Sequence, residues 1–115
     1  MIRLGELDRK AIFYHEVETG RNAKNEPVTR REELTRARAR RRDVSDAERF
    51  QAGRQDAALV SRFVVLSRTA TRRIREHMEF RCDGLLWQVQ GMKQVDLGRN
   101  RFLEITAVSV NENLV

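Results

Sequence analysis

A two-residue turn between two apolar-rich runs is the feature that most constrains this fold. The turn is Asp83-Gly84. A two-residue β-hairpin loop needs positive φ at its central positions, and Asp and Gly adopt such values at low cost. In the run after the turn, Leu85, Trp87 and Val89 fall on one face of an extended strand. The sequence therefore predicts an antiparallel hairpin here, with the rest of the chain built around it.

Further strands are expected before and after this hairpin. Residues 9–17 are rich in strand formers. Residues 57–68 are apolar on both faces of a strand, which indicates a central position. Residues 101–108 follow a polar turn at 96–100 and predict the last strand. We expect a mainly β fold, a small antiparallel β-barrel or sandwich of five or six strands with one short helix.

The short helix is predicted from a capping box. Ser45 can accept a hydrogen bond from the Glu48 amide, and the Glu48 side chain can reach back to Ser45. Gly53 is a natural stop signal. The helix would cover residues 46–52, with Phe50 as a buried contact.

The arginine-rich segment 28–42 is compatible with two structures. Its residues have good helix propensity, but a helix would have almost no apolar stripe. A strand would place Arg36 and Arg38 on one face, and Ala37 and Ala39 on the other. We prefer the strand.

A polar segment at residues 18–27 precedes it and predicts a long projecting loop. It contains Gly20, two asparagines and the only proline of the chain. Long polar loops often carry function. The candidate partner-docking residues are Arg21, Asn22, Lys24 and Asn25.

The charge of the chain favours a polyanion or an acidic protein surface. Lys and Arg number 23 against 17 acids, a net charge of +6. The candidates for contact with DNA or with another subunit are Arg30, Arg31, Arg36, Arg38, Arg40, Arg41 and Arg42. A solvated face is the alternative. The segment has no aromatic residue to stack on bases, so any DNA contact would involve the backbone.

Catalysis has little support in the sequence. One cysteine and two histidines do not supply the four ligands of a zinc site, and no Gly-rich phosphate loop follows a strand. A Cys82-His77 pair could act as nucleophile and base, but a structural thiol in an apolar strand is the better interpretation. We expect no enzyme activity, no cofactor and no metal. A single cysteine excludes an internal disulfide, and no run of the sequence has the length of a membrane span or of a signal peptide's apolar core.

We expect one domain over residues 1–115, and a basic turn at residues 69–78 is expected to be anchored on its core by Ile74. The predicted structural residues are Gly5, Leu7, Phe50, Phe63, Ile74, Gly84, Trp87 and Ile105.

The order of several short motifs resembles the bacteriophage head–tail joining proteins, also called head-closure or stopper proteins, which have relatives in gene transfer agents. The motifs are Leu4-Gly5-Glu6-Leu7-Asp8-Arg9, Asp46-Ala47-Glu48-Arg49-Phe50-Gln51-Ala52, Phe63-Val64-Val65-Leu66-Ser67-Arg68, Asp83-Gly84-Leu85-Leu86-Trp87-Gln88-Val89 and Gly98-Arg99-Asn100-Arg101-Phe102-Leu103-Glu104-Ile105. The resemblance covers nearly the whole chain. One departure is that Arg36-Ala37 stands where many members have Trp-Ala.

The resemblance implies a non-enzymatic virion protein at the head–tail junction. Such proteins form homo-oligomeric rings with sixfold-compatible symmetry and are not membrane proteins. The ring sits below a portal or adaptor protein and above a tail terminator or tail tube protein, and it retains packaged double-stranded DNA. The alternative is a stand-alone basic β-domain that binds the DNA backbone without sequence specificity.

Overall fold

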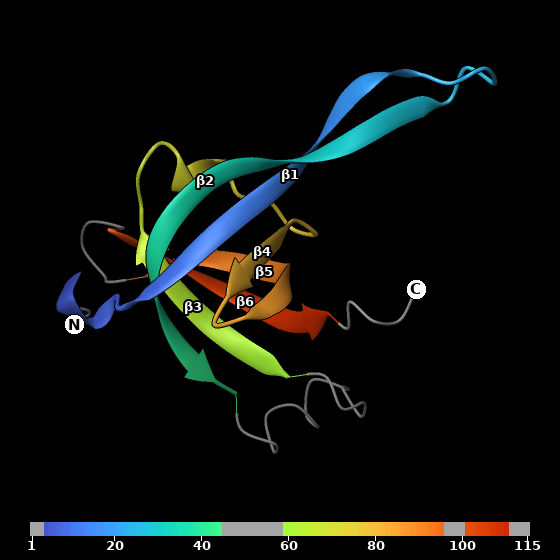
Figure 1. The fold of residues 1–115 in the computed structure, drawn as a ribbon. Coiled ribbons are helices and arrows are strands. Elements are labelled where there is room, and N and C mark those ends of the chain that lie inside the picture. The colour runs from blue at the N-terminus through green and yellow to red at the C-terminus, as the bar shows by residue number, and fades with distance from the viewer. Residues whose placement is uncertain (1–3, 45–58, 96–100, 111–115) are drawn as a thin grey trace.

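The computed structural model describes residues 4–44, 59–95 and 101–110, and these form six strands that close into a barrel. The elements are η1 (Leu4–Glu6), β1 (Arg9–Arg21), β2 (Pro27–Asp43), β3 (Val60–Leu66), η2 (Thr71–Arg73), β4 (Glu79–Cys82), β5 (Leu85–Val95) and β6 (Phe102–Val110), where η1 and η2 are short 3-10 helices. Neighbouring strands are antiparallel in the order β1-β2-β3-β6-β5-β4, and β4 returns to β1 (Figure 1). The predicted mainly β fold is confirmed. Of the two expected architectures, the structure is the barrel and not the sandwich.

Several expectations lie outside the described residues. They are the helix at 46–52 with its capping box and Phe50, and the turn at 96–100. Within the described residues, no helix has the length and apolar character needed to cross a membrane.

The predicted hairpin is present and carries the largest side chain of the core. Asp83 and Gly84 have φ values of 55° and 76°, as a two-residue loop requires. Trp87 is fully buried, and its Nε1 donates a hydrogen bond to the Cys82 carbonyl at 3.1 Å. Leu85 is 36% exposed, so the predicted apolar face of this strand begins at Trp87.

Aromatic rings fill the barrel interior around Trp87. Phe63 meets Trp87 edge-on at 5.0 Å between centroids, and Phe80 meets Phe63 edge-on at 4.9 Å. Phe13 lies 4.7 Å from Phe80. Ile105 is also fully buried in this cluster. Such arrangements add roughly 0.5–1.5 kcal/mol per aromatic pair beyond area burial.

Strand β3 is buried on both faces, which explains its continuous apolar character. Phe63 and Val65 point into the barrel core. Val64 points outward and packs with Leu7 and Phe102 in a small second cluster. The opening segment, which includes Gly5 in η1, thus covers part of the outer barrel wall.

Strands β1 and β2 continue past the barrel as a two-stranded ribbon, which we call the arm (residues 15–34). β1 pairs with β4 only over Ile12–Tyr14, and β2 pairs with β3 only over Ala39–Asp43. Beyond these positions each of the two strands has only the other as a partner among the described residues, and Figure 1 shows them extending away from the barrel.

The arm corrects the expected loop at residues 18–27. β1 continues to Arg21 and β2 starts at Pro27, so only residues 22–26 form the turn. The residues between Glu18 and the turn are exposed strand residues. A ribbon with no covering layer needs no apolar face, so its sequence has the polarity of a loop.

Candidate assembly interface

The basic segment is the second strand of the barrel, in agreement with the preferred interpretation. Ala37 and Ala39 are buried in the core, whereas Arg36 and Arg38 are exposed on the outer wall. The small alanine side chains allow the strand to pack closely on the aromatic core, and alternation places the arginines outside.

Most of the seven candidate arginines have an acidic partner within the chain. The ion pairs are Arg30 with Glu32, Arg31 with Glu79 at 3.8 Å, Arg36 with Glu33 at 2.9 Å, Arg40 with Glu6 at 3.2 Å, and Arg41 with Asp43 and Asp83. For Arg38 and Arg42, no acidic partner occurs among residues 4–44, 59–95 and 101–110. The uncompensated positive charge of this strand is therefore much smaller than its composition indicates.

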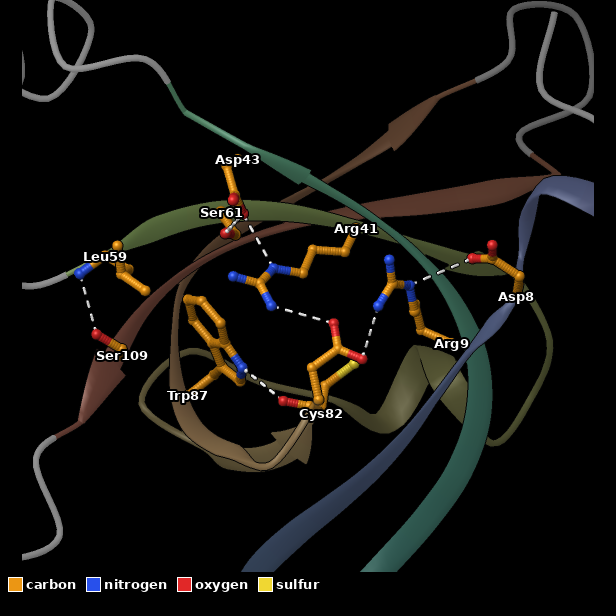
Figure 2. Close-up of polar contacts among 10 residues, drawn as sticks. Asp8, Arg9, Arg41, Asp43, Leu59, Ser61, Cys82, Trp87 and Ser109 are labelled. Carbon is orange, nitrogen blue, oxygen red and sulfur yellow. Dashed lines mark hydrogen bonds and ion pairs between the residues drawn. The ribbon is translucent and has the colours of Figure 1, made fainter.

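Arg41 differs from the other arginines because it points inward. Its guanidinium lies 4.9 Å from the centroid of the Trp87 ring, and its side chain is only 17% exposed. Arg41 Nε donates to Asp43 Oδ1 at 2.9 Å, and its Nη1 donates to Asp83 Oδ2 at 3.1 Å (Figure 2). Arg41 therefore covers the tryptophan and joins the end of β2 to the β4–β5 turn.

Two further side chains complete this polar network. Arg9 Nη1 donates to Asp83 Oδ1 at 3.1 Å, and Ser61 Oγ donates to Asp43 Oδ1 at 2.5 Å. The Ser61 hydrogen bond, aided by Arg41, lowers the pKa of Asp43. Burial acts to raise the pKa of Asp83, but hydrogen bonds from Arg41 and Arg9 outweigh it, and the net shift is downward. Both carboxylates are held in the ionised form.

Cys82 lies directly beneath this network and is a buried thiol. Burial, with a smaller contribution from the Asp83 charge, raises the pKa of Cys82 to about 11. The thiolate needed for nucleophilic attack is therefore disfavoured at neutral pH. His77 is exposed, and its backbone amide donates to the Val89 carbonyl at 2.9 Å. The described part of the chain holds no group of three or more His, Cys, Asp or Glu residues placed to bind a metal.

The arm itself is close to neutral. Its acids are Glu16, Glu18, Glu26, Glu32 and Glu33, and its bases are Arg21, Lys24, Arg30 and Arg31. Five negative charges against four positive ones do not make a surface for a polyanion. The arm is better suited to a protein partner than to DNA.

The candidate docking residues at the arm tip also hold its turn. The Asn22 side-chain oxygen accepts from the amides of Lys24 and Glu26 at 2.9 and 3.0 Å. Arg21 Nη1 donates to the Asn25 carbonyl at 2.8 Å, and Asn25 has φ of 62°. These contacts stabilise the turn at the tip, and preorganisation of this kind lowers the entropy cost of binding.

The barrel brings Lys10 and Arg68 beside the basic strand, and sequence reasoning missed both. Lys10 is opposite Arg38 in the β1–β2 ladder. Arg68 follows β3, and its Nη2 donates to the Arg36 carbonyl at 2.6 Å. Lys10 could have been found from the sequence by aligning the first two predicted strands as an antiparallel pair, which puts Lys10 beside the basic strand. Arg68 lies about thirty residues from Arg36, and no local signal joins them. Ile74, by contrast, is fully buried, as expected for the anchor of the following turn.

Comparison with known proteins assigns the family. A family model described as phage head completion protein matches residues 2–110, so the chain belongs to the phage head completion protein family. Its role is therefore a structural one in head completion, and its place is in the virion of a phage or phage-like particle. No curated protein matches the chain.

Two solved structures share the fold at low sequence identity. The solution structure of protein SF1141 from Shigella flexneri 2a is 19% identical, with a TM-score of 0.70, and the match covers 96% of this chain and 99% of that one. A chain of the virion of a native gene transfer agent particle is also 19% identical, with a TM-score of 0.63, and the match covers 90% of this chain and 94% of that one. Both likenesses extend over nearly the entire barrel.

Proposed function

We propose that this protein closes the head by forming a homo-oligomeric ring at the head–tail junction. The ring would have sixfold-compatible symmetry, with a portal or adaptor protein above it and a tail terminator or tail tube protein below it. The observation that carries the proposal is the head completion family match over residues 2–110. The fold shared with a gene transfer agent virion chain supports the same setting. In such a ring, one patch of each subunit meets a different patch of the next.

The arm is proposed to reach a neighbouring protein in this assembly. A two-stranded ribbon without a covering layer is only marginally stable in water. The arm therefore gains most from a partner that covers it, and its near-neutral charge suits a protein surface. The tip residues Arg21, Asn22, Lys24 and Asn25 would make the outermost contact.

Retention of packaged DNA is proposed to depend on closure of the ring around the channel rather than on a dense basic track. Arg30, Arg31 and Arg40 are already paired with acids, and Arg41 holds the barrel end. Arg42, like Arg38, is exposed and has no acidic partner among the described residues, so these two arginines are the remaining candidates to touch phosphate.

The isolated protein is expected to bind duplex DNA weakly and with a shallow salt dependence. Seven phosphate contacts would give a slope of log K against log salt of about −6, whereas one or two contacts give about −1 to −2. We expect the shallow slope, reduced by about 1 in Arg42→Ser and unchanged in Arg30→Ser. The measurement is fluorescence anisotropy of a labelled duplex between low and moderate salt. A slope near −6 would favour a stand-alone DNA-binding domain instead.

Electron cryomicroscopy of the head–tail junction tests the proposed location. We expect a closed ring in which each subunit density fits the six-stranded barrel and each arm contacts a neighbouring chain. Particles whose junction contains no copy of this protein would refute the proposal.

A further inference from the structure

A groove forms where β2 separates from β3. The ladder between the two strands ends at the Ala39–Val65 pair. β3 ends at Leu66, while β2 continues toward the arm. Among the described residues, the edge of β2 that faces away from β1 therefore has no strand partner before Ala39.

Two adjoining hollows lie along this edge, and we call them together the β2 groove. They have volumes of about 370 and 280 Å³ and share Ala37, Arg38 and Arg68. The first is also lined by Asp8, Lys10 and Arg36, and the second by Leu4, Leu7 and Leu66. One end of the groove is thus cationic and the other is apolar.

The cationic end has more positive charge than its own acids balance. Neither Lys10 nor Arg38 has an acidic partner among the residues that the structure describes. The Asp8 carboxylate lies 3.6 Å from the Arg9 guanidinium, so this acid is already engaged. An anionic group entering the groove would meet Lys10 and Arg38, which have no competing acidic partner among the described residues.

The apolar end has an exposed leucine. Leu4 is 55% exposed, the highest value among the large hydrophobic side chains in the described ranges. Beside it, Leu7 is buried and Leu66 is half-buried. Covering exposed apolar surface favours formation of a complex. A ligand that contacted only the cations would leave Leu4 exposed and would not gain from burial of its apolar surface.

We propose that the β2 groove binds an extended segment of a neighbouring structural protein of the particle. The segment would place an apolar side chain on Leu4 and Leu66 and carboxylates on Lys10 and Arg38. An extended chain suits this edge of β2. Backbone groups other than the Arg36 carbonyl, which already accepts from Arg68, can add hydrogen bonds to side-chain recognition there. The inference rests on the proposed function, because that function supplies the neighbour. A DNA backbone fits less well, because its phosphates would make no favourable contact with the leucines at the apolar end.

An array of overlapping 12-residue peptides tests the inference, with the full-length protein as the labelled probe. The peptides would cover the structural proteins encoded in the same gene cluster. We expect the bound peptides to combine apolar and acidic residues. Arg38→Glu and Leu4→Ser should each weaken binding by about tenfold, since both side chains are exposed and the fold should be kept.

Two matched control variants carry the same types of substitution, Arg to Glu and Leu to Ser, at exposed positions outside the β2 groove. Arg73→Glu on η2 reverses another exposed arginine, and Leu59→Ser removes another exposed leucine. Both controls should bind the peptides as the wild type does. Circular dichroism of all four variants would show whether each keeps the fold.

The inference is overturned if no peptide binds, or if binding is unchanged by the two groove variants. It is also overturned if a 20-base-pair duplex binds more tightly than any peptide and loses this binding in Arg38→Glu. Its failure is distinguishable from failure of the proposed function. A ring at the junction with no peptide binding refutes only the groove, and peptide binding without the protein at the junction refutes only the location.

Discussion

Replacing Trp87 with alanine is expected to lower the free energy of unfolding by about 3–5 kcal/mol, because a fully buried large aromatic side chain would leave a cavity. Trp87 contacts Phe63 inside the barrel and Arg41 at its end. The free energy of unfolding of a folded domain is usually only about 5–15 kcal/mol in total. The variant should therefore be partly unfolded or prone to aggregation at growth temperature.

Two neighbouring substitutions separate the parts of this effect. Trp87→Phe keeps a ring but loses the Nε1 donor to the Cys82 carbonyl, and it should cost about 1–3 kcal/mol. Leu85→Ala removes a partly exposed side chain two residues away and should cost less than about 1 kcal/mol. Urea unfolding followed by circular dichroism gives all three values. Equal losses for Trp87→Ala and Leu85→Ala would contradict the described core.

Adjacent arginines are expected to respond very differently to alanine substitution. Arg41→Ala should lower the free energy of unfolding by about 1–3 kcal/mol, because it removes one hydrogen-bond donor from Asp43 and one from Asp83 and uncovers Trp87. Arg42→Ala should change it by less than about 0.5 kcal/mol, because this side chain is exposed. Thermal unfolding of the two variants at pH 7 makes the comparison.

The pH dependence of the free energy of unfolding is a second test of the network of Arg41, Asp43 and Asp83. The folded-state pKa values of Asp43 and Asp83 are lowered, so both groups stabilise the fold above their unfolded pKa of about 3.9. This contribution is lost as the pH falls from about 4 through the lower folded values. Arg41→Ala should flatten this acid-dependent loss. Equal effects of the two arginine substitutions, or an unchanged acid profile, would show that Arg41 does not hold the barrel end.

Local patterns in the sequence predict much of the barrel. The Asp83-Gly84 turn is visible because only a few residue types adopt positive φ at low cost. The two-sided apolar character of residues 60–66 and the buried anchor Ile74 follow from hydrophobic pattern alone. In the basic strand, the alternation of alanine and arginine indicates which face is buried.

The full length of β1 and the contacts of Arg41 could not be predicted in the same way. No described residues cover the arm, and the end of β1 at residues 18–21 lacks the apolar alternation that marks a strand. Alternation puts Arg41 on the same face of β2 as Ala37 and Ala39, but only the closed barrel places Trp87 and Asp83 beside it. The β2 groove likewise depends on Arg68, which reaches β2 only through the tertiary fold.

Deletion of this gene from the phage or phage-like particle tests the central claim most directly. Particles would be purified from the deletion strain and from the same strain complemented with the intact gene. Electron microscopy would score attached tails, and nuclease treatment would measure retained DNA. We expect the deletion to yield heads that lack tails and lose their DNA, with both properties restored by complementation. Particles with normally attached tails and fully retained DNA would contradict a role in head completion.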